Sequence, residues 1–180
     1  MLEDILKLMF ETAHSRPAGS LSPALDPLFD QLAQAQSTEQ AAQIEDQIWA
    51  LWMEHPADSA REMLERARQT MAEGNFTLSG TLLDRIVEDY PDYAEAWNKR
   101  ATLRFLQGRD GESLRDIEQS LRLEPRHFGA VCGFAQICLR QDREELALFA
   151  LQRAQALHPN LESVNEAIAR LASRRKGLAH

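Results

Sequence analysis

Three prolines recur at one fixed interval in the second half of the chain. Pro91, Pro125 and Pro159 are each separated by 34 residues. Aligning the chain on them divides residues 60–161 into three equal blocks: 60–93, 94–127 and 128–161. A constant period over several blocks is typical of supersecondary units that stack on one another, so this spacing constrains the fold more than any other feature.

Matching columns of the three blocks carry residues of matching size. Columns eight and twenty hold small residues, column twenty-four holds a large apolar residue, and column fifteen holds a turn former. In block order these columns are Ala67, Ala101 and Ala135; Ser79, Ser113 and Ala147; Leu83, Ile117 and Leu151; and Gly74, Gly108 and Asp142. The pattern predicts two antiparallel helices per block that approach closely at the small residues and end at the glycine.

The composition favours helix throughout. The chain is 44% hydrophobic with only 8 glycines and 7 prolines, and its dominant residues, Ala, Leu, Gln, Glu and Arg, are good helix formers. Runs of β-branched residues are missing, so a sheet has little to build on. We therefore expect an all-α protein in which each block buries its apolar face against its neighbours.

The middle block resembles the tetratricopeptide repeat (TPR). The residues that carry the resemblance are Trp97, Ala101, Phe105, Gly108, Ser113, Ile117, Leu123 and Pro125. The stretches WNKRA and LEPRHFGA are further similar to a bacterial branch of these proteins. The resemblance covers residues 60–161 and implies a superhelical array of about three TPR units; it is specific for the fold and says little about chemistry.

Two arginines depart from the family pattern. Arg100 and Arg104 stand where the family places Leu and Tyr, on a face that packs between blocks. Unpaired buried charge is costly, and Asp84 and Glu88 share a helix face in the preceding block. We expect these four residues to form an ion-pair lock between repeats rather than a ligand site.

Residues 23–56 predict a degenerate helical hairpin before the repeats. Its second helix spans 37–55, with Ser37 as the N-cap. Trp49 and Trp52 lie at helical spacing and are expected in the core. We expect this hairpin to cap the array as a fourth, degenerate repeat.

The two ends of the chain predict further helices. Residues 1–14 form an amphipathic helix with Leu2, Ile5, Leu6 and Met9 on one stripe, and residues 15–22 form a linker. A helix this short must dock on something. It could dock in the groove of its own repeats, serve as a homodimer handle against a second copy, or bind a partner protein. Residues 162–180 form a capping helix and a tail.

The resemblance implies a ligand groove lined by the first helix of each block. Thirteen positions match the groove columns of the family: Arg61, Leu64, Arg68, Met71, Glu95, Asn98, Thr102, Phe105, Leu106, Cys132, Gln136, Leu139 and Arg140. Apolar residues and arginines in such a groove suit an extended peptide or amphipathic helix of a partner protein, with some acidic character. The carboxylate clamp of some relatives is not reproduced.

Charge and cysteine content limit the partners and the compartment. The net charge is −8, and all of the excess lies in residues 1–59, which argues against nucleic acid or a membrane as partner. Cys132 and Cys138 would lie about 9 Å apart along one helix, too far for a disulfide. No apolar run is long enough to span a bilayer. We expect a cytoplasmic protein, unless a signal peptide precedes Met1.

No catalytic constellation emerges from the sequence. The five histidines lack metal-ligand spacing, and phosphate-binding glycine loops and the GxSxG motif are absent. We therefore expect neither an enzyme nor a cofactor or metal site. The leading hypothesis is an interaction scaffold or adaptor; the alternatives are a secretion-type chaperone and a homo-oligomeric structural protein.

Overall fold

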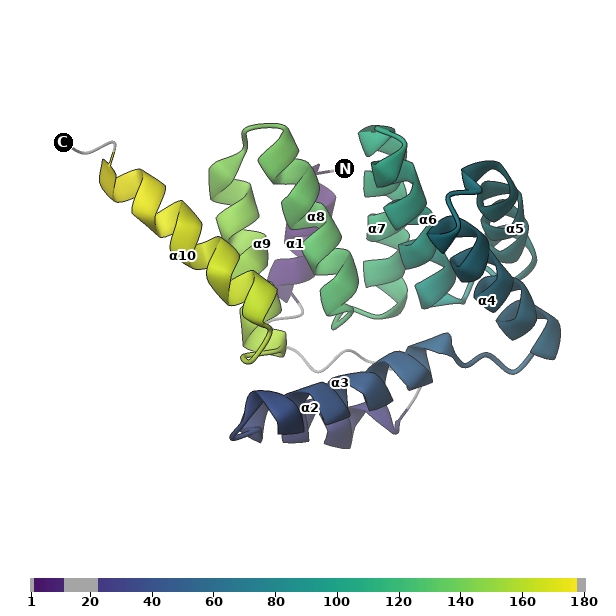
Figure 1. Ribbon diagram of the computed structural model, residues 1–180, viewed down its shortest axis with the longest axis horizontal. Helices are drawn as coiled ribbons and strands as arrows, with labels where there is room; N and C mark the ends of the chain where they lie inside the picture. The colour runs from purple at the N-terminus through teal and green to yellow at the C-terminus, as the bar shows by residue number, and fades with distance from the viewer. Residues whose placement is uncertain (1, 12–22, 178–180) are drawn as a thin grey trace.

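The computed structural model describes residues 2–11 and 23–177, and these residues form ten helices and no strand. The all-α class is thus confirmed for the described part of the chain. Paired helices stand side by side in a row, with a further hairpin lying across one end of the pairs (Figure 1). The whole of the expected linker, residues 12–14 of the expected N-terminal helix and the tail from residue 178 lie outside the described residues.

The three predicted blocks are three helical hairpins. In order, their helices are α4 (Asp58–Ala72) and α5 (Phe76–Asp89), α6 (Ala94–Leu106) and α7 (Asp110–Leu123), and α8 (Phe128–Arg140) and α9 (Glu144–Leu157). Helix α6 approaches α4 and α8 more closely than α7 approaches α5 and α9. The array therefore curves with the first helix of each repeat on its inner side.

The small residues let the two helices of each repeat touch. Ala67 and Ala101 are buried, and a serine lies opposite each of them. The Ser79 hydroxyl donates to the carbonyl of Ala67 at 2.9 Å, and Ser113 donates to that of Ala101 at 2.8 Å. A larger side chain in either column would force the helices apart.

The turn within each repeat uses left-handed backbone. Gly74 and Gly108 have φ angles of 78° and 74°, and Asp142 takes the same role at 56°. These positions follow the last turns of α4, α6 and α8, where a left-handed residue ends a helix. The predicted helix stops are confirmed.

Helix α10 (Glu162–Gly177) closes the C-terminal end of the array, as expected for a capping helix. It packs on α9 through the buried side chains of Val164 and Leu171. Its other described faces carry mostly polar, exposed residues, which suits the solvent-facing end of a repeat stack.

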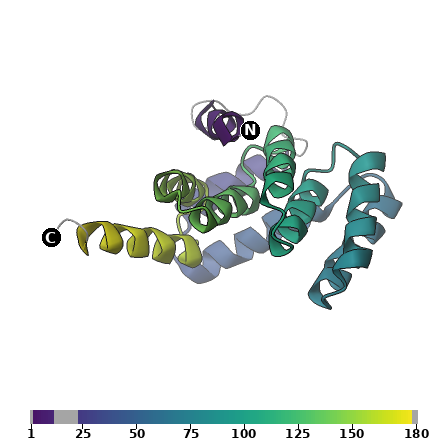
Figure 2. The ribbon, with the colours of Figure 1, turned by 90° about the horizontal axis from the view of Figure 1, so that it is seen from above.

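The N-terminal hairpin forms as expected, but it lies elsewhere. Helices α2 (Leu25–Gln34) and α3 (Thr38–Met53) pair, and the Ser37 hydroxyl caps α3 by accepting from the N–H of Gln40. The hairpin does not stack on α4 as a further repeat would. It lies across the ends of α6, α8 and α9 (Figures 1 and 2), because its aromatic side chains pack on Phe128 at the start of α8.

Helix α1 (Leu2–Glu11) docks on the outer side of the array. Ile5 and Met9 are buried against α7, the second helix of the middle repeat. Figure 2 shows α1 set apart from the α2–α3 hairpin, on another side of α8 and α9. The hypothesis that this helix fills the groove of its own repeats is wrong, since α1 packs on α7, a second helix, whereas the predicted groove residues lie on the first helices.

Candidate partner-binding groove

The inner faces of α4, α6 and α8 carry the thirteen predicted groove residues, and the structure divides the α6–α8 part into two halves. The covered half comprises Glu95, Asn98 and Cys132, near the first turns of α6 and α8. The open half contains the remaining α6 and α8 positions: Thr102, Phe105, Leu106, Gln136, Leu139 and Arg140. Helix α3 lies over the covered half.

The covered half is closed by a buried polar cluster. The carboxylate of Glu95 is fully buried and accepts from Asn98 Nδ2 at 2.9 Å, while Lys99 Nζ lies 2.8 Å from it. His127 Nε2 is 2.8 Å from the same carboxylate. His127 Nδ1 accepts from the N–H of Ala130, so Nε2 is the nitrogen that bears the proton and donates to Glu95. These groups are engaged with one another and are not available to a ligand.

Two tryptophans of α3 seal this cluster. Trp52 stacks on the His127 ring with 4.0 Å between ring centroids, and Lys99 Nζ lies 5.0 Å from the ring centroid of Trp49. Both tryptophans also contact Phe128. The expectation that Trp49 and Trp52 belong to the core is confirmed.

Helix α3 is further tied to the array through Glu45. Its carboxylate accepts from the indole N–H of Trp49 at 3.0 Å and lies 3.0 Å from Nε2 of His158, at the end of α9. The hydrogen bond with His158 lowers the pKa of Glu45. Burial, with a contribution from the Glu45 charge, raises the pKa of Cys132 to about 12. Both cysteines are free, and Cys132 stays a neutral thiol at physiological pH.

The open half presents apolar side chains to solvent. Leu106 is 54% exposed, and Phe105 and Leu139 are partly exposed beside it. Between α6 and α8 a small hollow of about 30 Å³ is lined by residues that include Thr102 and Gln136. Hydroxyl and amide groups next to apolar side chains can hydrogen-bond a peptide backbone while its side chains are buried.

The arginines of the predicted groove already have acidic partners. Arg140 pairs with Asp110 and lies over the Phe105 ring, with its guanidinium carbon 3.7 Å from the ring centroid. Arg68 pairs with Glu65 at 2.6 Å. These pairs reduce the attraction for an acidic ligand that the sequence suggested.

The α4 positions contribute unequally to the groove. Leu64 is fully buried in the core, so the structure removes it from any ligand surface. Arg61 turns toward the α3–α4 loop, where it donates to the carbonyl oxygen of His55 and pairs with Asp58. Met71 is partly exposed.

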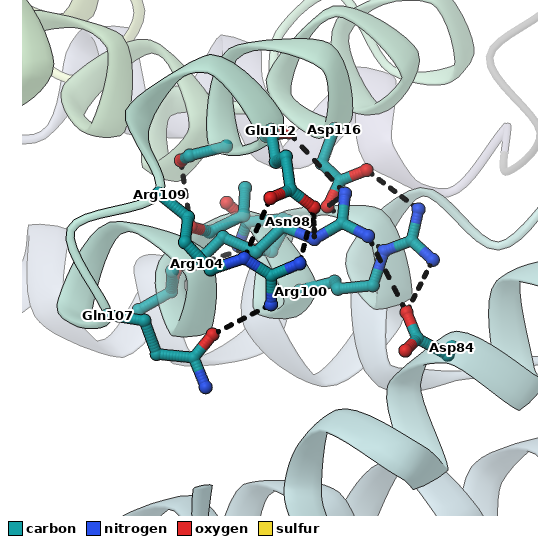
Figure 3. Close-up of polar contacts among 11 residues, drawn as sticks. Asp84, Asn98, Arg100, Arg104, Gln107, Arg109, Glu112 and Asp116 are labelled. Carbon is teal, nitrogen blue, oxygen red and sulfur yellow. Dashed lines mark hydrogen bonds and ion pairs between the residues drawn. The ribbon is translucent and has the colours of Figure 1, made fainter. Parts of the chain in front are cut away.

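An ion-pair network behind the groove joins the first two repeats. Arg100 donates to Asp116 at 2.8 and 3.0 Å and to Asp84 at 2.9 Å. Arg104 lies 2.7 Å from Asp116, 3.5 Å from Asp84 and 3.7 Å from Glu112. Figure 3 shows the two guanidiniums between Asp84 of α5 and the acids of α7. Burial raises the pKa of Asp116, and the two guanidiniums oppose that shift.

The predicted lock is therefore right for Asp84 and wrong for Glu88, which is exposed and has no ion pair among the described residues. Asp116 and Glu112 take its place, and the sequence analysis missed them. They lie on α7, the second helix of the same repeat, which a long arginine side chain reaches as easily as the preceding repeat. Their spacing of four residues, matching that of the two arginines, was the available signal.

The described residues contain no group of three His, Cys, Asp or Glu side chains placed to hold a metal ion. Among the helices that the structure describes, none combines the length and hydropathy needed to cross a bilayer.

Comparisons with known proteins agree with this architecture. No family model matches the chain. A TPR repeat-containing protein of Rhizobium etli is 33% identical over 153 residues, which is 85% of this chain and 75% of that protein.

Solved structures of TPR domains superpose at low sequence identity. The first TPR of Spaghetti (RPAP3), bound to the HSP90 peptide SRMEEVD, has a TM-score of 0.61 at 15% identity and covers 68% of this chain and 94% of its own. The Arabidopsis OM64 TPR domain has a TM-score of 0.62 at 13% identity, with 65% and 97% covered. MamA has a TM-score of 0.60 at 12% identity, with 77% and 79% covered.

Proposed function

Because the chain belongs to the family of TPR repeat-containing proteins, we propose that it is a protein-interaction scaffold whose open half, on α6 and α8, binds a short segment of a partner protein. The observation that carries this proposal is the exposure of Leu106 beside Phe105 and Leu139. Exposed apolar side chains grouped on a concave surface are typical of a docking site.

The geometry supports a short ligand with apolar anchors. Helix α3 covers the first turns of α6 and α8, so a ligand on these two helices is restricted to the six positions of the open half. Thr102 and Gln136 are exposed and can hydrogen-bond an extended backbone. Since the nearby arginines are already paired, acidic side chains are not required of the partner.

The same site argues for binding rather than catalysis. The charged side chain of the open half, Arg140, is paired with Asp110, and Glu95 and His127 satisfy each other beneath α3. A secretion-type chaperone would use the same open half for an apolar segment. A homodimer that used the buried side of α1 would require that helix to leave α7, where Ile5 and Met9 are buried.

A peptide selection tests the proposal. Peptides selected from a phage-displayed library on the immobilised full-length protein would be synthesised, and their dissociation constants measured by fluorescence anisotropy. We expect apolar anchors in the selected peptides and an affinity loss of about tenfold in Leu106→Ser, because a buried leucine contributes about 1.5 kcal/mol or more.

Phe10→Ser is the matched control. Phe10 is also a large exposed apolar residue, but it lies on α1 outside the groove. Its substitution should leave the affinity unchanged. A selection that yields no binder, or binders equally affected by both substitutions, would refute docking in the open half.

A further inference from the structure

A separate cavity of about 490 Å³ lies where the α2–α3 hairpin meets the repeats. The hairpin, the α3–α4 loop, α4, the α5–α6 turn and the end of α7 all contribute to it. Its size falls in the range of small-ligand sites, which is about 300–1,000 Å³. It is distinct from the open half, since none of the six residues of the open half lines it.

Apolar side chains form the inner wall of the cavity. Leu25, Trp52, Tyr93 and Ala94 are buried, and Leu123 is partly exposed. They come from four helices and one turn, and they enclose a cavity because the hairpin lies across the repeats. Such a wall suits an aromatic or aliphatic body.

One carboxylate oxygen in this wall accepts no hydrogen bond from the described residues, although most of its side chain is buried. The side chain of Glu124 is 5% exposed and lines the cavity. Its Oε1 accepts from the backbone N–H of Arg126 at 3.0 Å and from the guanidinium Nε at 3.2 Å. Its Oε2 has no hydrogen bond among the described residues. A charged acceptor that is nearly buried and half satisfied favours a donor inside the cavity.

Charges at the rim have the same sign. Asp92 and Glu54 are 64% and 69% exposed, and each has only a long ion pair, to His55 at 3.5 Å and to Arg61 at 3.7 Å. Arg61 is the one arginine or lysine among the lining residues, and it is already engaged with Asp58 and a backbone carbonyl. Since Glu124 is paired with Arg126 and Arg61 with Asp58, the two exposed rim carboxylates give the mouth of the cavity a negative potential.

We propose that this cavity binds a small organic cation, a protonated amine or guanidinium carried on an aromatic or aliphatic body. The cationic head donates to Glu124 Oε2, and the body packs against Trp52, Tyr93 and Leu123. The same chemistry is available from a free amine or from a basic side chain of a bound protein. This site is independent of partner binding in the open half.

A titration of the full-length ¹⁵N-labelled protein tests the cation. The probe is phenethylamine, and the two matched probes are 2-phenylethanol, which lacks the charge, and 3-phenylpropionate, which reverses it. We expect phenethylamine to shift the indole N–H of Trp52 and the amides of Tyr93, Ala94 and Glu124. Equal binding of the alcohol, or no shift at these residues with any probe, would overturn the proposal.

Substitutions locate the cationic head. Glu124→Gln keeps the acceptor for Arg126 and removes the charge, and we expect about tenfold weaker binding of phenethylamine, as for loss of one charge-assisted hydrogen bond. The exposed double variant Glu54→Gln/Asp92→Asn should weaken binding about threefold by reducing the rim potential, without unfolding the protein.

The matched control is Glu88→Gln/Asp89→Asn, which removes two exposed carboxylates from α5 outside the cavity. It should leave the affinity for phenethylamine unchanged. If this control weakens binding as much as the rim variant does, the net charge of the protein and not the rim carboxylates attracts phenethylamine, and the site is refuted. Because the rim variant keeps its fold, this comparison holds even if Glu124→Gln is unstable.

Two further titrations distinguish the sources of the cation. The blocked peptide acetyl-Phe-Arg-amide presents the guanidinium on a chain, whereas phenethylamine is free. Tighter binding of the peptide supports a partner's basic side chain as the natural occupant, and exclusion of the peptide supports a free amine. Exclusion of both contradicts the cation site.

Discussion

Charge burial at a single residue, Asp116, joins the two helices of the middle repeat, and the exposed Asp84 links the same arginines to the first repeat. Asp116 is 1% exposed and contacts both Arg100 and Arg104, whereas Asp84 is 63% exposed and contacts the same two guanidiniums. Removing a buried acid leaves two partly buried cations without their main partner, while removing an exposed acid leaves groups that water can solvate.

We therefore expect Asp116→Ala to lower the free energy of unfolding by about 3 kcal/mol and Asp84→Ala by about 0.5 kcal/mol. Urea unfolding followed by circular dichroism measures both. Equal costs for the two substitutions would mean that the contacts of Asp116 are as solvated as those of Asp84.

Of the acids in this network, the sequence predicted only Asp84. The displaced family residues showed that Arg100 and Arg104 face an interface, and Asp84 lay within reach on the preceding block. The acids that pair with the arginines are selected by the side-chain conformations of Arg100 and Arg104, which reach both α5 and α7. The position of a residue within the repeat does not determine its side-chain conformation, so Asp116 was missed and Glu88 was wrongly included.

At the scale of elements, the contact between α3 and α8 depends on a glycine. A Cβ built on Gly129 would lie 2.8 Å from the Trp49 ring, whereas one on Gly133 would meet Ile117 at an ordinary 3.5 Å. Both glycines lie in α8.

Gly129→Ala should lower the free energy of unfolding by about 2 kcal/mol, because overpacking forces α3 away from the array. Gly133→Ala should raise it by up to about 1 kcal/mol through helix propensity. Thermal melts of the two variants give the comparison. Stabilisation by both substitutions would show that α3 does not lie against α8.

The attachment of the hairpin also depends on pH through Glu45. The hydrogen bond with His158 lowers the pKa of Glu45 from its ordinary value of 4.5. A carboxylate whose pKa is lowered by folding contributes stability above its unfolded pKa and loses it as pH falls through the folded value.

The stability difference between the wild type and Glu45→Gln should therefore be constant near neutral pH and shrink below about pH 4.5. Unfolding followed by tryptophan fluorescence measures it, because Trp49 donates to Glu45. Glu39→Gln, at an exposed position of the same helix, is the control. A difference that persists unchanged in acid would exclude the Glu45 contact as a source of stability.

Helix positions followed from the sequence, but the docking of the N-terminal helices did not. The expected N-cap Ser37 located the start of α3 well. Where α3 docks depends on Trp52 meeting His127 and on Trp49 meeting Lys99. These contacts join residues far apart in the chain and leave no periodic signal. The same holds for α1, whose stripe was recognised but whose partner, α7, was not.

At the scale of the whole molecule, the 34-residue period determines a curved array, and the hairpin then decides which surfaces remain open. Helix α3 closes the first turns of α6 and α8, and the open half is left to a partner. Two of the thirteen groove positions that the family pattern nominated, Leu64 and Glu95, are fully buried. A family pattern cannot anticipate this, because the hairpin lies outside the repeats.

The most direct test of this account is hydrogen–deuterium exchange on the full-length protein with and without a selected peptide. If the partner binds the open half while the hairpin stays in place, protection will rise at 102–106 and 136–140 and stay unchanged over 25–53. Faster exchange over 38–53 on binding would show that the partner displaces α3, and the division of the groove into two halves would be wrong.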